Sequence, residues 1–179
     1  MAERIFGKPI ITQVEMQRRI KELGRRISID YEGKDLLVVG VLKGAFAFFA
    51  DLIRAIRLPV RVDFIMVSSY GVKSKSAGRV KVISDLTEDI AGQDVLIVED
   101  IVDSGLTVNS LRKNFMPRRP KSLRFCALLD KQERRKIDVV IDYVGFKIPN
   151  KYVVGYGLDY QDKYRNLSYI AVLENVDEE

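Results

Sequence analysis

The sequence contains no histidine, and this absence excludes whole classes of chemistry. Ser-His-Asp and Cys-His nucleophilic catalysis, zinc sites with histidine ligands and histidine proton switches all need imidazole. The single cysteine, Cys126, cannot form a disulfide within the chain, which favours a reducing, cytoplasmic location. Acid–base chemistry must therefore come from Asp, Glu, Lys or Tyr, and any metal should be a hard cation held by oxygen ligands.

Long apolar runs, internal repeats and low-complexity segments are also missing. No stretch approaches the roughly 18 apolar residues of a membrane-spanning helix, and residues 1–4 lead into no signal-peptide core. We therefore expect no membrane association and no export. No linker divides the 179 residues, a length typical of one domain. The 30 Lys and Arg against 25 Asp and Glu suit a polyanionic ligand, a nucleic acid or an acidic partner equally well.

The apolar pattern predicts an α/β protein. Near-continuous apolar runs of strand length alternate with helical segments, which is typical of a mainly parallel sheet covered on both faces. Thr12 and Glu15 have the spacing of a capping box. They open a Lys- and Arg-rich segment that suits a solvated helix face or a nucleic-acid surface. We expect helices over 12–27, 45–56 and 108–115. We expect strands over 36–42, 60–67, 80–83, 94–98, 123–129, 139–144, 152–154 and 169–173.

Candidate chemistry is concentrated at the end of the strand that begins at residue 94. Its apolar run leads into Glu99, Asp100 and Asp103, and a short loop over 104–107 opens the next helix. Carboxylates at a strand end can hold sugar hydroxyls or hydrated Mg²⁺. A glycine-containing loop at a helix N-terminus offers N–H groups and a positive dipole end to a phosphate. Any one of these acids could instead be an ordinary loop or cap residue, but together they predict a ligand site at the strand ends.

Segment 95–107 resembles the phosphoribosyl diphosphate signature of the type I phosphoribosyltransferases. Its variant, Glu-Asp-x-x-Asp-Ser-Gly-x-Thr, is similar to that of the bacterial 6-oxopurine branch, the hypoxanthine (hypoxanthine-guanine) phosphoribosyltransferases. Three further regions resemble that branch in order: the diphosphate loop and its helix at 40–51, the start of the catalytic loop at 68–71, and the base-binding region at Lys131, 151–160 and 164–167.

The resemblance implies a type I phosphoribosyltransferase fold. This is an α/β domain over 1–179, with a mainly parallel five-stranded core sheet flanked by helices at about 30–145 and a small hood from about 1–29 and 146–179. It also implies a Mg²⁺-dependent transferase of purine salvage. Such an enzyme moves the 5-phosphoribosyl group of 5-phosphoribosyl 1-diphosphate to N9 of hypoxanthine or guanine, giving IMP or GMP and diphosphate. Homodimers or homotetramers are expected on the same ground.

The resemblance also assigns roles to matched residues. Asp103 would be the general base at purine N7, and the metal ligands would be Glu99, Asp100 and, for a second Mg²⁺ on the diphosphate, Asp159. Ribose and 5′-phosphate would be held by Glu99, Asp100, Asp103, Ser104, Gly105, Leu106 and Thr107. Diphosphate would be held by Leu42, Lys43, Gly44 and Arg165, with a non-proline cis peptide before Lys43. The purine would be bound by Lys131, Tyr152, Val153 and Asp159, although Lys131 also opens a run, 131–136, that reads as exposed charge.

Two features leave alternatives open. Ser69 and Tyr70 would begin a mobile lid over 70–79, a stretch equally suited to a plain surface loop. The basic segments also keep open an RNA- or DNA-binding regulator on the same fold, although the chain has no extra helix-turn-helix and we expect no nucleic-acid partner. Within enzymes, a preference for xanthine or guanine is the other alternative.

Overall fold

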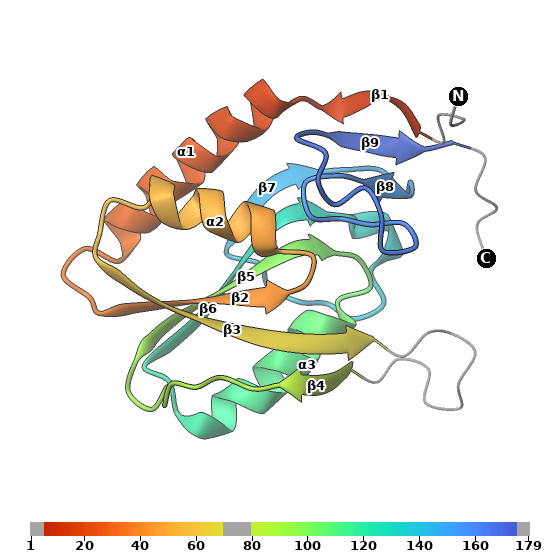
Figure 1. Ribbon diagram of the computed structural model, residues 1–179. Coiled ribbons are helices and arrows are strands. Elements are labelled where there is room, and N and C mark those ends of the chain that lie inside the picture. The colour runs from red at the N-terminus through yellow and green to blue at the C-terminus, as the bar shows by residue number, and fades with distance from the viewer. Residues whose placement is uncertain (1–5, 70–79, 175–179) are drawn as a thin grey trace.

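The computed structural model describes residues 6–69 and 80–174, which form two β-sheets with flanking helices (Figure 1). The larger sheet has six strands in the order β4-β3-β2-β5-β6-β7. Its parallel strands are β2 (Leu36–Leu42), β3 (Val60–Ser69), β5 (Asp94–Val102), β6 (Ser122–Asp130) and β7 (Tyr143–Lys147). β4 (Val80–Ser84) pairs antiparallel with β3 at one edge. The mainly parallel five-stranded core is confirmed, with one antiparallel edge strand added.

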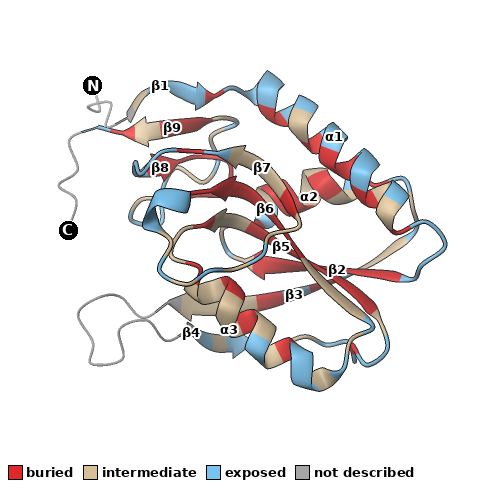
Figure 2. Cartoon of the chain, turned by 180° about the vertical axis from the view of Figure 1, so that it is seen from behind, coloured by how far each residue is buried: buried red, intermediate tan, exposed pale blue. Residues whose placement is uncertain are grey.

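Alternation along the central strands explains why both faces of this sheet are covered. In β2, Leu36 and Val38 belong to one buried cluster, whereas Leu37 and Val39 belong to the other. Helices α1 (Gln13–Asp30) and α2 (Phe46–Ala55) cover the first face, and α3 (Leu106–Phe115) covers the second (Figures 1 and 2). Burial on both faces is the physical origin of the continuous apolar runs.

A second sheet brings the two ends of the described chain together. It has three antiparallel strands in the order β1-β9-β8, where β1 is Phe6–Ile11, β8 is Val153–Val154 and β9 is Ile170–Leu173. Figure 1 shows it above the end of the large sheet toward which the arrowheads of β2, β3 and β5 point. β1 was not among the predicted strands. The division into a core and a hood stays a prediction.

Most other boundaries lie close to the predicted ones. The capping box of α1 is present, because Glu15 N–H donates to Thr12 Oγ1 and Thr12 N–H donates to Glu15 Oε2. The strand predicted over 139–144 is wrong in position, since β7 spans Tyr143–Lys147. Short 3-10 turns lie at Met116–Arg118 (η1) and Gln132–Arg134 (η2). Among the described residues, no helix is long and apolar enough to cross a membrane.

Candidate active site

β5 delivers two acidic side chains to the carboxyl end of the large sheet. Glu99 is buried, and its carboxyl group hydrogen-bonds to that of Asp100. The backbone N–H of Ile101 donates to Asp100 Oδ1 at 2.7 Å. Burial raises the pKa of Glu99 well above the ordinary carboxyl range, and the neighbouring Asp100 charge raises it further. Burial also raises the pKa of Asp100. A cation bound to this pair would favour its charged form and displace the proton.

The loop after β5 shapes the N-terminus of α3. Gly105 has a φ of 83°, and a Cβ at this position would overlap the carbonyl oxygen of Ile137. The Ser104 carbonyl accepts hydrogen bonds from the N–H groups of Lys136 at 2.9 Å and Ile137 at 3.1 Å. Leu106 N–H reaches the Ser104 hydroxyl at the long distance of 3.4 Å. Because Gly105 brings no capping side chain, the first turn of α3 can offer its N–H groups to an anion.

The loop between β2 and α2 lies directly beside these acids. The peptide bond between Leu42 and Lys43 is cis, as the family resemblance implied. A Cβ on Gly44 would overlap Oδ2 of Asp100, and a Cβ on Gly157 would overlap the carbonyl oxygen of Gly44. The 42–44 loop is therefore sandwiched between the acid pair and the turn that contains Gly157.

Arg165 fixes that same turn. Its Nη1 donates to the Gly157 carbonyl at 2.8 Å, while its Nη2 lies 2.7 Å from Asp159 Oδ1 and 3.2 Å from Asp162 Oδ1. Asp162 Oδ1 also lies 3.5 Å from the ammonium of Lys43. The two cations predicted to bind diphosphate, Lys43 and Arg165, are thus brought to one carboxylate.

Two of the predicted purine-binding residues, Lys131 and Tyr152, lie close together. Lys131 is 5% exposed, so it is not part of a solvated charge run. Its N–H donates to the carbonyl of Val102 at 2.9 Å, and its ammonium lies 5.8 Å from the ring centroid of Tyr152. The half-exposed Tyr152 ring stands edge-on to Tyr160, with centroids 6.3 Å apart. Val153, which follows it, is buried in β8.

Asp103 is held by the turn that follows Lys131. Arg135 Nε donates to the Asp103 carbonyl at 3.2 Å. Asp103 Oδ1 lies 3.5 Å from Arg134 Nε in an ion pair. Among the described residues, this oxygen has no hydrogen-bond partner although it is shielded from water. In the described part of the chain, this oxygen is therefore held by the Arg134 ion pair alone and keeps a hydrogen-bonding position open.

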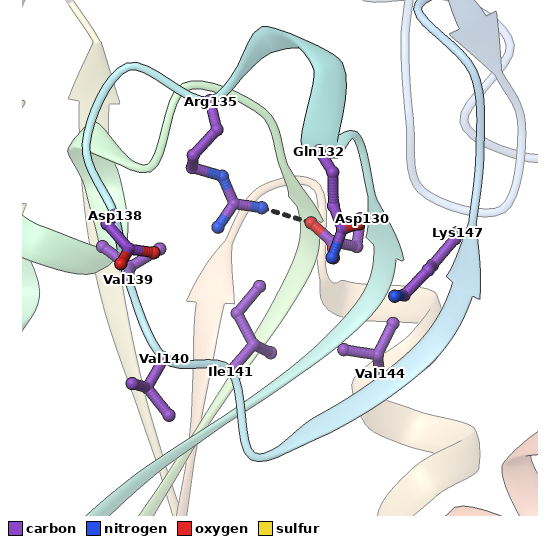
Figure 3. Close-up of a pocket in the computed structure, with 9 residues that line it drawn as sticks. All are labelled: Asp130, Gln132, Arg135, Asp138, Val139, Val140, Ile141, Val144 and Lys147. Carbon is purple, nitrogen blue, oxygen red and sulfur yellow. Dashed lines mark hydrogen bonds and ion pairs between the residues drawn. The ribbon is translucent and has the colours of Figure 1, made fainter.

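A cavity of about 460 Å³ lies beside the same turn (Figure 3). Arg135 points toward Asp130 and pairs with its carboxylate. The residues that line this cavity include none of the predicted site residues that the structure describes. Those residues lie instead at the ends of β2, β3, β5 and β6 and in the segment 152–165 around β8.

The predicted metal ligands fall into two places. Asp159 pairs with Arg165 and not with Glu99 and Asp100. Within residues 6–69 and 80–174, no group of three or more potential ligands gathers at one point. Mg²⁺ is commonly held by one or two carboxylates together with substrate oxygens and water, so the Glu99–Asp100 pair fits it. Ser69 ends β3, whereas Tyr70 and the rest of the predicted lid, 70–79, lie outside the described residues.

Three residues at this site were not predicted from the sequence. Gly157 supports the carbonyl of Gly44, Asp162 pairs with two cations, and Arg135 holds the Asp103 carbonyl. Positions 155 and 157 are alternating glycines, which could have signalled a close backbone approach. No local signal marks Asp162 or Arg135, since both lie in charged segments.

Comparison with known proteins agrees with this geometry. A model of the phosphoribosyl transferase domain matches residues 10–161. The chain is 53% identical over 171 residues to a hypoxanthine-guanine phosphoribosyltransferase of Mycobacterium avium, covering 92% of this chain and 84% of the relative. It is 48% identical over 174 residues to the enzyme of that name from Bacillus subtilis, covering 97% of each. A hypoxanthine-guanine phosphoribosyltransferase crystal structure from Bacillus anthracis has a TM-score of 0.89 at 48% identity, covering 93% of this chain and 98% of that one.

The chain therefore belongs to the phosphoribosyltransferase family. Its relatives place it in the hypoxanthine-guanine branch of that family.

Proposed function

We propose that this chain is a purine-salvage enzyme that transfers the 5-phosphoribosyl group of 5-phosphoribosyl 1-diphosphate to N9 of hypoxanthine or guanine. The products are IMP or GMP and diphosphate. The main support is the position of Gly44 between Asp100 and Gly157, because it joins the acid pair, the diphosphate loop and the Arg165 turn at one place.

The charge changes of the reaction give each group a role. Positive charge develops on the ribose ring while negative charge develops on the departing diphosphate, as in other glycosyl transfers. Glu99 and Asp100 would hold the ribose hydroxyls and Mg²⁺. The bound ion would supply positive charge to the diphosphate oxygens. Lys43 and Arg165 would receive the diphosphate, and the N-terminus of α3 would receive the 5′-phosphate. Asp159 would hold a second Mg²⁺.

Base recognition and proton transfer fall to Lys131 and Asp103. The ammonium of Lys131 can donate to the O6 atom of a 6-oxopurine but cannot accept a hydrogen bond from a 6-amino group. Tyr152 offers a half-exposed ring on which the base can stack, and the Val153 backbone can contact its 2-position. Asp103 would accept the proton from N7 as the new bond forms. In this proposal, the small sheet and its connections form a hood over the base.

The chemistry also suggests a setting. The single cysteine, Cys126, suits a reducing cytoplasm, and an assembly of two or four chains is expected from the family. Size-exclusion chromatography with light scattering distinguishes dimer from tetramer.

Steady-state rates with hypoxanthine, guanine, xanthine and adenine test the function directly. We expect Mg²⁺-dependent turnover of hypoxanthine, guanine or both. We expect no turnover of adenine above background. Turnover mainly of xanthine would favour the alternative specificity. If no base is converted, the proposed function is wrong.

A nucleic-acid-binding regulator on the same fold is the second candidate. It is favoured by exposed basic residues of α1, namely Arg18, Lys21, Arg25 and Arg26. Non-specific electrostatic binding weakens steeply between about 50 and 200 mM salt. Nanomolar RNA binding that persists at about 200 mM salt would support this candidate.

A further inference from the structure

Asp162 lies between the two cations that the proposed function assigns to diphosphate. Its Oδ1 is 3.5 Å from Lys43 Nζ and 3.2 Å from Arg165 Nη2. These cations lie far apart in the sequence, since Lys43 follows β2 and Arg165 precedes β9. One carboxylate oxygen therefore bridges them.

Both terminal nitrogens of the Arg165 guanidinium already have acceptors within the chain. Nη1 donates to the Gly157 carbonyl, and Nη2 is near both Asp159 and Asp162. The hydrogen bond from Arg165 and the charge of Lys43 lower the pKa of Asp162, so its carboxylate is charged at neutral pH. Two carboxylates thus face two cations, and the cluster carries no net charge before ligand binds.

A diphosphate has to contact the same nitrogen atoms. Guanidinium and ammonium groups bind phosphate oxygens through donors that carboxylates also occupy. In the proposed function Asp159 has a second partner, Mg²⁺, to which it can turn when ligand arrives. Asp162 has no such role there, and its negative charge would face the incoming phosphate oxygens.

We propose that Asp162 is a built-in competitor of diphosphate, which occupies Lys43 and Arg165 in the free enzyme and must leave them before diphosphate binds. This inference rests on the proposed function of those two cations. When diphosphate departs, the carboxylate returns to the same nitrogen atoms and opposes rebinding. Asp162 thereby sets the affinity of the site without contacting the reacting atoms.

The expected size of the effect follows from exposure. The side chains of Lys43 and Asp162 are 63% and 74% exposed, whereas that of Arg165 is 22% exposed. Exposed ion pairs are weak and screened by salt, so removing the competitor should lower the Kd of diphosphate by about two- to tenfold. The difference should shrink at about 0.5 M salt.

Isothermal titration calorimetry of magnesium diphosphate with the full-length enzyme tests this inference. Asp162→Asn is the informative variant, because Asn removes the charge and tolerates the φ of 59° at this position. Glu32→Gln is the matched control, since Glu32 is exposed and precedes β2 at the end opposite Lys43. We expect Asp162→Asn to bind diphosphate more tightly, and Glu32→Gln to bind it as the wild type does. Equal or weaker binding by Asp162→Asn overturns the proposal, as does an equal gain in Glu32→Gln.

A double-variant cycle with Lys43→Met shows whether the tighter diphosphate binding of Asp162→Asn depends on Lys43. Once Lys43 is absent, Asp162→Asn should improve the Kd by a smaller factor. An undiminished factor would contradict the competition with Lys43. The activity of the wild type separates this result from the proposed function. If the wild type forms IMP or GMP but Asp162→Asn does not bind diphosphate more tightly, only the competitor role of Asp162 is refuted. A wild type that neither binds diphosphate nor forms nucleotide refutes both.

Discussion

Gly44 and Asp100 lie in direct contact, with no room for a side chain between them: a Cβ at position 44 would overlap Asp100 Oδ2. We therefore expect Gly44→Ala to displace the Asp100 carboxylate or the diphosphate loop. A misplacement of about 1 Å can cost about 100-fold in rate, so kcat/KM should fall by about that factor. Steady-state kinetics over a range of 5-phosphoribosyl 1-diphosphate concentrations measure this loss.

Gly33→Ala is the matched control for that substitution. Gly33 has a φ of 74° with no described atom within 4 Å of an added Cβ. We expect it to lose about 1 kcal/mol of stability from backbone strain and to keep its activity per folded molecule. If Gly44→Ala retained the kcat/KM of the wild type, the contact with Asp100 would not constrain the site.

The central strands and first helix could be predicted because their signals are local. The apolar run of β5 is buried on both faces of the sheet, and Thr12 and Glu15 form their capping box within one turn. The acids after β5 and the glycine at the start of α3 are likewise one continuous segment. These features could be predicted because residue types and short spacings determine them.

Other elements depend on distant partners. β1 pairs with β9 in a ladder that register shifts interrupt. Its own residues carry little strand signal, because they include Gly7 and Pro9. The apolar run at 139–144 was assigned to a strand, but Val139 packs beside Gly105, and Asp142 N–H donates to the Phe125 carbonyl just before β7. The contact between Gly157 and Gly44 has the same non-local origin, and so does the ion pair between Asp162 and Lys43.

The buried acid pair predicts a pH-dependent cost to stability. Glu99 has its pKa raised by burial, so the folded protein keeps a proton that the unfolded chain releases near pH 4.5. Stability should therefore fall as pH rises from about 4.5 to the raised pKa, by about 1.4 kcal/mol for each pH unit in that interval. Glu99→Gln removes this titration. Its melting temperature should match that of the wild type near pH 4.5 and exceed it near pH 8, while activity falls sharply.

Thermal unfolding at those two pH values, with the exposed Glu32→Gln as control, measures the difference. Mg²⁺ added with 5-phosphoribosyl 1-diphosphate should stabilise the wild type more than Glu99→Gln near pH 8, because the ion favours the charged acids. A Glu99→Gln protein that is less stable than the wild type near pH 8 would contradict the raised pKa.

Asp103→Asn should separate catalysis from binding. In the proposed function the Asp103 carboxylate accepts the purine proton, and an amide in its place keeps the shape but not the basicity. General-base catalysis typically contributes about 100- to 10,000-fold. We expect kcat to fall within that range, while the Kd of 5-phosphoribosyl 1-diphosphate changes only a few-fold. Turnover within a few-fold of the wild type would show that Asp103 is not the base.

Lys131→Ala tests how the base is selected. In the proposed function the buried ammonium near Tyr152 donates to O6 of the purine. Its removal should therefore raise the KM for hypoxanthine and weaken the rejection of adenine. Competition assays with hypoxanthine and adenine measure both effects. Lys136→Ala, in the exposed part of the same charged segment, should leave them unchanged. A Lys131→Ala enzyme with wild-type affinity and discrimination would exclude this role.

Arg134 and Arg135 are neighbours in the chain, but their ion pairs should contribute differently to stability. The side chains of Arg135 and its partner Asp130 are 16% and 3% exposed, whereas those of Arg134 and Asp103 are 45% and 37% exposed. Removing one partner of a buried pair leaves an uncompensated charge and costs about 3–5 kcal/mol, whereas an exposed pair contributes less than about 1 kcal/mol. Urea unfolding should therefore show a large loss for Arg135→Gln and a small one for Arg134→Gln.

The double variant Arg135→Met with Asp130→Asn identifies the cause of that loss. If the cost in Arg135→Gln comes from the stranded Asp130 carboxylate, neutralising it should recover much of the stability. Because Arg135 also donates to the Asp103 carbonyl, the recovered protein should still bind 5-phosphoribosyl 1-diphosphate more weakly than the wild type. Equal losses in Arg135→Gln and Arg134→Gln would mean that water reaches the Arg135–Asp130 pair. Unimpaired binding in the double variant would mean that Arg135 does not position the loop after β5.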